Sequence, residues 1–147
     1  ILKVITGPHF PNSEWEKLIV LRGQIPGLEI VRFVDNLVDE WNQACLSISM
    51  GGYNTLLEII NHQIPALVIP FENDRNQEQL IRARRFEELG LIKILKLNKL
   101  STAELAVEIQ SNLKIKPNNF FVDTEGAIKT AEILLTLNKK IKDEIVY

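Results

Sequence analysis

The sequence predicts an α/β fold in which a parallel sheet of about five strands lies between helices on both faces. Short apolar or β-branched runs recur along the 147 residues, and amphipathic helical patterns separate them. Strands that alternate with helices in this way form right-handed βαβ units and therefore parallel sheets. The hydrophobic content of 46% is sufficient for one core, so we expect a single domain over residues 1–147.

The expected elements follow from these runs and from capping residues. Strands are predicted at residues 2–6, 28–33, 45–49, 66–69 and 91–95. Ser13 with Glu16, and Ser101 with Glu104, have the spacing of a capping box, which predicts that helices begin there. The other expected helices are LVDEWNQ capped by Asp35 or Asn36, YNTLLEIINH capped by Asn54 or Thr55, residues 75–89 ended by Gly90, and a last helix from Asp123 or Thr124 to about Lys140.

The segment SMGGYNTLLE, residues 49–58, is the most informative part of the chain. Gly51 and Gly52 end a strand, and an apolar helix follows at once. Glycines can adopt positive φ and let a ligand approach the backbone closely. A helix N-terminus offers unpaired N–H groups and about half a positive charge, so this segment predicts an anion site that suits a diphosphate.

Glu58 lies one turn into that helix, on the face opposite the apolar Leu56, Ile59 and Ile60. A carboxylate at this place can accept hydrogen bonds from a hydroxyl pair such as a ribose diol. A glycine-rich turn followed by a solvated glutamate explains the same residues without a ligand. The motif alone leaves both interpretations open.

A second polar cluster occurs at the start of a later helix, RNQEQLIRARR. Glu78 and Gln79 are candidates for recognition of a hydroxyl-rich substrate, because loops after parallel strands meet at one edge of the sheet. An ordinary polar helix start is the alternative. His9, in the loop GPHFP, is a weaker candidate at the same edge.

Composition narrows the possible partners. The net charge of −2 comes from interspersed acidic and basic residues, so we expect neither nucleic acid nor an anionic membrane as a partner. No apolar run is long enough to span a membrane, and His9 and His62 are too far apart in sequence to suggest a metal site. The single Cys45 predicts a packed core thiol and a cytoplasmic, reducing location. The chain begins within a strand, so we expect it to be part of a longer protein.

In their order along the chain, several motifs resemble the nucleotide-sugar half of GT-B glycosyltransferases, specifically the family 28 type of the peptidoglycan N-acetylglucosaminyltransferase. The similarity is closer still to bacterial predicted glycosyltransferases with an SMGGYNT-like motif. It covers nearly the whole chain and implies a Rossmann-like, three-layer domain, the C-terminal half of a GT-B fold. The family's first strand and its N-terminal acceptor domain are missing, which implies a strand order of 2-1-3-4-5. The motifs are VITGP, VRFVDNL, MGGYNTLLE, IPALVIPF, NQEQLIRARRFEELG and DTEGAIKTAEILL.

The resemblance also implies roles for individual residues. Phe33 and Val34 would frame the nucleobase, and Glu58 would bind the ribose. Arg82 and Ala83 occupy the place of the family's Asn-Ala pair. The residues implied to hold the diphosphate are Gly51, Gly52, Tyr53, Asn54 and Thr55, and those implied to contact the sugar are Glu78 and Gln79, or Gln77 and Glu78 if the alignment slips by one.

The implied activity is that of the donor-binding half of an inverting glycosyltransferase, with a UDP-sugar as the default donor and with neither metal nor cofactor. The general base would come from the acceptor domain, in cis or in trans, so this chain alone would bind a donor without turnover. Two alternatives remain: a nucleotide-sugar hydrolase or epimerase of the same fold, and a non-catalytic module that binds a sugar nucleotide.

Overall fold

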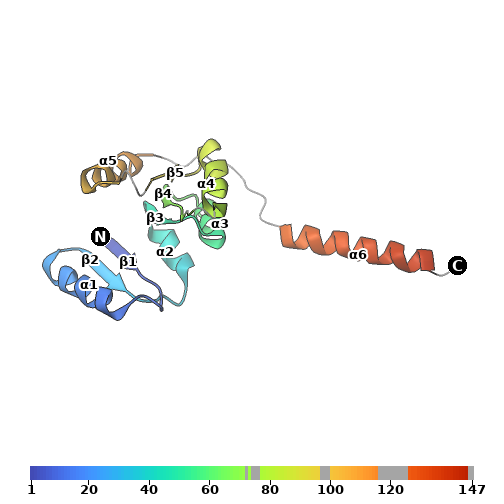
Figure 1. Ribbon diagram of the computed structural model, residues 1–147, viewed down its shortest axis with the longest axis horizontal. Helices are drawn as coiled ribbons and strands as arrows, with labels where there is room; N and C mark the ends of the chain where they lie inside the picture. Colours follow the sequence, from blue (N-terminus) through green and yellow to red (C-terminus); the bar gives the residue numbers. More distant parts are fainter. Residues whose placement is uncertain (72, 74–76, 97–99, 116–125, 146–147) are drawn as a thin grey trace. The chain divides into compact units, whose positions relative to one another are not determined.

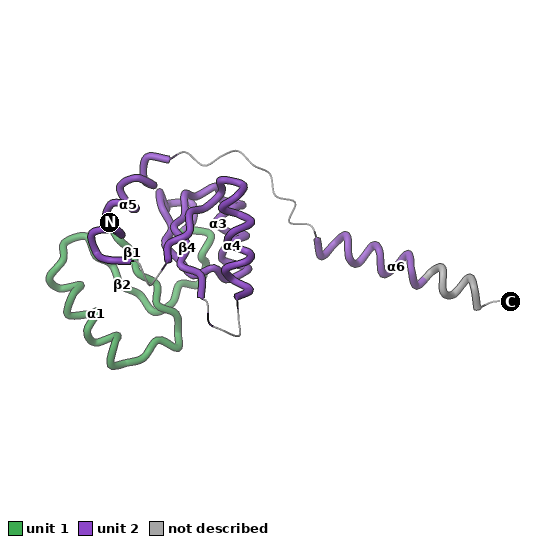
Figure 2. The backbone as a smooth tube through the Cα atoms, turned by 45° about the horizontal axis from the view of Figure 1, so that its top comes forward, with its two compact units in different colours: residues 1–40 green, residues 41–147 purple. Residues whose placement is uncertain are grey.

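The computed structural model of the chain describes residues 1–71, 73, 77–96, 100–115 and 126–145, with side chains up to residue 138 (Figure 1). Contacts within the chain divide it into two compact units, Ile1–Glu40 and Trp41–Tyr147 (Figure 2). The first unit is a small βαβ arrangement. The second contains a three-stranded sheet and the larger apolar core.

The first unit is built from β1 (Leu2–Ile5), α1 (Asn12–Gln24) and β2 (Leu28–Val31), and α2 (Leu37–Gln43) begins at its end. β1 and β2 are parallel neighbours, with Leu2 opposite Leu28 and Ile5 opposite Val31. Gly27 has a φ of +81°, which allows the chain to turn from α1 into β2, and its carbonyl accepts a hydrogen bond from Leu2 N at 2.9 Å.

The second unit contains a parallel sheet in the order β3-β4-β5. β4 is the central strand, and Ala66, Leu67 and Val68 are at most 2% exposed, as expected for a strand covered on both faces. The elements are β3 (Ser47–Met50), α3 (Tyr53–Asn61), β4 (Ala66–Ile69), α4 (Glu78–Glu88), β5 (Lys93–Ile94), α5 (Thr102–Asn112) and α6 (Gly126–Ile145).

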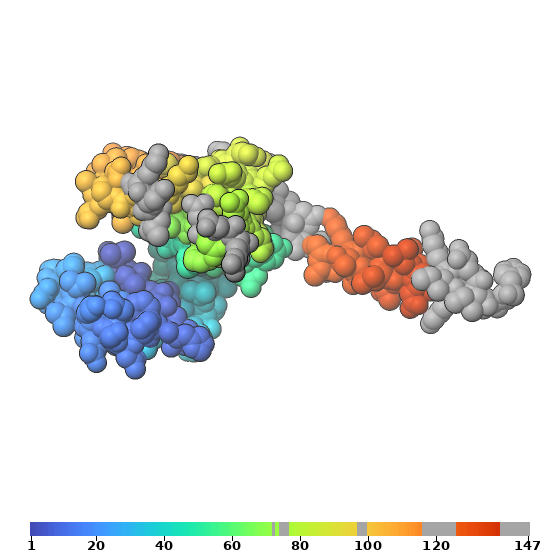
Figure 3. Space-filling view, viewed as in Figure 1, coloured from blue at the N-terminus to red at the C-terminus, as the bar shows by residue number. Residues whose placement is uncertain are grey.

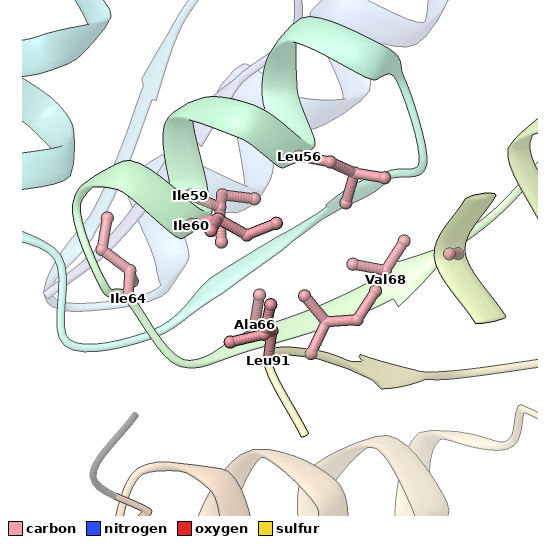
Figure 4. Close-up of a cluster of buried hydrophobic side chains, with 9 residues drawn as sticks. Leu56, Ile59, Ile60, Ile64, Ala66, Val68 and Leu91 are labelled. Atoms are coloured by element: carbon pink, nitrogen blue, oxygen red, sulfur yellow. The ribbon is translucent and has the colours of Figure 1, made fainter. Parts of the chain in front are cut away.

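The core of the second unit forms where α3 packs on β4 (Figure 4). Leu56 and Ile59, one helical turn apart, are fully buried and lie over the face of the strand that carries Ala66 and Val68. Burial of a leucine or isoleucine side chain contributes about 1.5–3 kcal/mol. This packing holds the first turn of α3 at the carboxyl end of β3.

The predicted α/β class and the parallel pairing are confirmed. The five strands, however, form two hydrogen-bonded sheets, β1-β2 and β3-β4-β5, so the predicted single sheet is divided after its second strand. The order predicted within each part is the observed one. β5 is also shorter than predicted, because only residues 93 and 94 pair with β4.

Three capping predictions are confirmed. Ser101 Oγ accepts a hydrogen bond from Glu104 N at 3.2 Å, and Glu104 Oε2 accepts one from Ser101 N at 2.8 Å, which is a complete capping box. Asn36 Oδ1 accepts a hydrogen bond from Val38 N at 3.0 Å. Gly90, predicted to end its helix, has a φ of +70° just after α4.

Other local predictions are wrong. α1 begins at Asn12, after Pro11, so Ser13 lies inside the first turn and makes no cap with Glu16. The extended backbone of Pro11 starts that helix without a side-chain cap. Cys45 is exposed rather than packed, because β3 begins at Ser47 and the cysteine precedes it. The predicted start of the last helix, Asp123 or Thr124, lies outside the described residues.

Candidate functional site

The glycine pair connects β3 directly to α3, as predicted. β3 ends at Met50, Gly52 is the N-cap residue, and α3 begins at Tyr53. Neither glycine needs positive φ: Gly52 has a φ of −62°, and the described glycines with positive φ are Gly7, Gly27 and Gly90. The positive φ expected for the two glycines is therefore wrong, and packing gives a different reason for Gly51.

Gly51 lies in a closely packed position. A Cβ atom at this position would lie 3.3 Å from Gln79 Cβ, 3.4 Å from Gln79 O and 3.4 Å from Pro70 Cβ. The absent side chain lets the first turn of α4 approach the turn between β3 and α3. The structure therefore brings together two clusters that are far apart in sequence, the glycine segment and the start of α4.

The N-terminus of α3 has no side-chain cap. Asn54 and Thr55, predicted to cap this helix, lie within its first turn, because the N-cap position belongs to Gly52. Glycine has no side chain that can accept hydrogen bonds from the first-turn N–H groups. Tyr53 and Asn54 are exposed, and Thr55 is half-buried. The end of α3 thus keeps the amide donors and the positive dipole end that favour an anion.

Glu58 lies on the polar face of α3, as predicted. Its Oε2 is 3.6 Å from His62 Nε2, and its side chain remains 46% exposed. His62 Nδ1 lies 3.1 Å from Asn42 Oδ1, so the ring connects α3 to α2. A separation of 3.6 Å is too long for a hydrogen bond, so the carboxylate keeps acceptor capacity for a ligand.

At the start of α4, the predicted sugar-contacting residues have different environments. Gln79 is half-buried, and its Oε1 accepts a hydrogen bond from Phe71 N at 3.0 Å, which fixes the chain leaving β4. Glu78 is the first residue of α4 and is exposed. Gln77, the alternative under a shifted alignment, is the exposed N-cap residue. Figure 3 shows α4 at the surface of its unit.

Arg82 is a residue of this site that the sequence analysis did not select as a candidate. Its guanidinium forms an ion pair with Glu78 and lies over the ring of Tyr53, 5.1 Å from the ring centroid. The i, i+4 spacing of Glu78 and Arg82 was readable in the sequence. The contact with Tyr53 was not, because it joins two helices.

Phe33 and Val34 belong to the first unit, just after β2. Phe33 is 64% exposed, which is unusual for a phenylalanine and leaves its ring available to a ligand. The preceding Arg32 donates hydrogen bonds to Phe10 O at 3.2 Å and Asn12 Oδ1 at 2.7 Å. These bonds tie the loop after β1, which carries the exposed His9, to the end of β2.

The described part of the chain contains no group of three or more His, Cys, Asp or Glu side chains that could hold a metal ion. Among the same residues, no helix combines the length and the apolar character needed to cross a membrane.

The sequence profile described as Glycosyltransferase family 28 C-terminal domain matches residues 2–135. The chain belongs to this family. Similarity to individual glycosyltransferases agrees with the match. A UDP-N-acetylglucosamine--N-acetylmuramyl-(pentapeptide) pyrophosphoryl-undecaprenol N-acetylglucosamine transferase of Thermosipho africanus is 27% identical over 94% of this chain. The transferase of the same name from Oenococcus oeni is 30% identical over 76% of this chain.

The matched region is only part of those relatives. The chain covers 38% of the Thermosipho protein and 30% of the Oenococcus protein, so it spans about a third of their length. A solved structure described as the glycotransferase of kitacinnamycin has a TM-score of 0.61 and 20% identity, and the match covers 78% of this chain and 27% of that one. This likeness supports the GT-B fold expected for a family 28 domain. The closer similarity to proteins with an SMGGYNT-like motif stays a prediction.

Proposed function

We propose that this chain is the donor-binding domain of an inverting glycosyltransferase that uses a nucleoside-diphosphate sugar, with a UDP-sugar as the expected donor. The observation that carries the proposal is the N-terminus of α3 in a family 28 domain, capped by a glycine and in contact with the start of α4. Two of its relatives, from Thermosipho africanus and Oenococcus oeni, are named as UDP-N-acetylglucosamine-dependent transferases, which supports UDP as the nucleotide.

In this proposal the diphosphate accepts hydrogen bonds from the first N–H groups of α3. As the bond between the sugar and the diphosphate breaks, negative charge grows on the leaving phosphate oxygen. The helix N-terminus is already oriented toward that charge, so it stabilises the transition state without reorganisation. The residues proposed to surround the diphosphate are Gly51, Gly52, Tyr53, Asn54 and Thr55.

The remaining groups of the donor are assigned to the other residues that the family resemblance implies. Glu58 accepts hydrogen bonds from the ribose hydroxyls, and its 46% exposed side chain suits this role. Glu78 and Gln79 contact the sugar, and Phe33 and Val34 frame the base. An N-terminal acceptor domain, on the same polypeptide or on a partner chain, supplies the general base that activates the acceptor hydroxyl. A cytoplasmic location belongs to the same proposal.

Calorimetric titration of the 147-residue chain with UDP, ADP, GDP and dTDP tests the proposal. We expect one nucleotide to bind selectively. Glu58→Ala should weaken that binding by about 1–3 kcal/mol, because it removes a charged acceptor from the ribose hydroxyls. Glu88→Ala, which removes an exposed glutamate from the end of α4, is the matched control and should leave affinity unchanged.

Failure of all four nucleotides to bind would overturn the proposal for this chain. Equal binding by the wild type and Glu58→Ala would reject the ribose assignment alone. A hydrolase or epimerase of the same fold would bind the same nucleotides, so product analysis with the complete protein distinguishes these enzymes from a transferase.

A further inference from the structure

Arg82 connects the first residues of two helices. Its guanidinium lies over Tyr53, which begins α3, and pairs with Glu78, which begins α4. Long side chains in a helix point back toward its N-terminus, so a residue four positions into α4 reaches this end. One planar cation thus contacts both groups of residues proposed to hold the diphosphate and the sugar.

Stability alone is a weak explanation for this cluster. The Glu78 side chain is 72% exposed and the Arg82 side chain 22% exposed. An ion pair whose acidic partner is largely exposed contributes little to folding, and a cation–π contact with a tyrosine that is 57% exposed is also weak. Both interactions strengthen when a ligand covers them and excludes water, because the local dielectric constant falls. The geometry is therefore more useful to a bound ligand than to the unliganded fold.

We propose that Arg82 is a positioning residue for the sugar part of the donor. This inference rests on the proposed function. The guanidinium holds the Glu78 carboxylate in one orientation, and a carboxylate has about four lone-pair sites, so it can accept from a sugar hydroxyl in addition to its pairing with Arg82. It also restrains Tyr53 beside the first N–H groups of α3. Ordering these groups before binding lowers the entropy lost when the sugar binds.

The proposal separates two ligands that differ only in the sugar. A bare nucleoside diphosphate uses the α3 amides and Glu58 and should depend little on Arg82. A sugar nucleotide also uses Glu78 and should depend on it strongly. If the role of Arg82 were purely structural, its substitution would instead lower the affinity for both ligands equally and lower the unfolding temperature.

The test is calorimetry of the 147-residue chain with UDP and UDP-N-acetylglucosamine, or with the corresponding pair for the base selected above. Arg82→Gln should lower the affinity for the sugar nucleotide roughly tenfold and the affinity for UDP less than about threefold. Arg82→Lys, which keeps the charge but loses the planar fork, should fall between the wild type and Arg82→Gln. Arg84→Gln, on the same helix and exposed, is the matched control and should change neither affinity. Thermal unfolding of each variant confirms that it is folded.

A double variant sharpens the result. If Arg82 acts by holding Glu78, the double variant that carries Glu78→Gln and Arg82→Gln should bind the sugar nucleotide about as weakly as either single variant. Additive losses would overturn the positioning role. So would equal losses for the two ligands, no loss for either, or a wild-type chain that binds UDP but not the sugar nucleotide. If the wild type binds no nucleotide at all, the proposed function fails and this inference fails with it.

Discussion

The helices α3 and α5 begin in opposite ways. α5 begins with a complete capping box, in which Ser101 and Glu104 exchange side-chain and backbone hydrogen bonds. α3 begins at a glycine that offers its first-turn amides no side-chain acceptor. Capping residues satisfy donors within the chain, whereas a glycine leaves them for solvent or a ligand. The start of α5 is thus satisfied within the chain, and the uncapped start of α3 is consistent with the binding role proposed for it.

Adding a capping side chain to α3 is the strongest test of this contrast between α3 and α5. The backbone of Gly52 suits any residue, with a φ of −62°, and a Cβ there would meet only Thr55 Oγ1 at 3.7 Å. In Gly52→Asp, the new carboxylate should accept hydrogen bonds from the first-turn amides and repel a diphosphate. We expect nucleotide affinity to fall by about 2–3 kcal/mol, while stability rises by a few tenths.

Calorimetry and thermal unfolding measure the two effects of Gly52→Asp. The control is Gly52→Ala, which adds a Cβ without a cap or a charge and should keep affinity within about threefold of the wild type. Unchanged affinity in Gly52→Asp would exclude the amides of α3 as the nucleotide site.

Substitution of Gly51 should have the next largest effect, which is a loss of stability. Valine at this position places methyl groups against Gln79 and Pro70, where even a Cβ is 3.3–3.4 Å from its neighbours. Overpacking of this kind costs about 1–3 kcal/mol, so Gly51→Val should lower the free energy of unfolding by that amount in urea titrations. It should also displace the start of α4 from the glycine segment.

An open glycine gives the contrasting result. Gly23 lies inside α1 with nothing within 4 Å of its would-be Cβ, so Gly23→Ala should stabilise the chain by about 0.5–1 kcal/mol. If Gly51→Val were also neutral or stabilising, close packing would not be the reason for glycine at that position.

The features predictable from sequence are those set by local pattern. The apolar positions Leu56, Ile59 and Ile60 predicted the buried face of α3, and all three are buried. The Ser101–Glu104 spacing predicted its capping box because both partners lie within one turn. At Pro11 and Gly52 the same reasoning failed, since those helices begin one or two residues before the residues expected to cap them.

Contacts between distant segments were not predictable. Gly51 was expected to adopt positive φ, which it does not, and the contact with Gln79 for which it leaves room was not expected. Arg82 was read only as part of a motif, although its contact with Tyr53 crosses from α4 to α3. Such pairs depend on how strands and helices pack, and a single sequence does not contain that information. The order of the motifs indicated the family but not these contacts.

The smallest expected effect is at α5. Ser101→Ala removes the hydroxyl that accepts a hydrogen bond from Glu104 N, and it should lower the free energy of unfolding by about 1 kcal/mol. Ser111→Ala, in the last turn of α5, removes only a hydroxyl that donates to Val107 O, so it should change stability by no more than a few tenths. Because α5 is capped for stability, Ser101→Ala should leave nucleotide affinity at the wild-type value. A loss of affinity at unchanged stability would mean that the start of α5 also belongs to the binding site, and the contrast with α3 would fail.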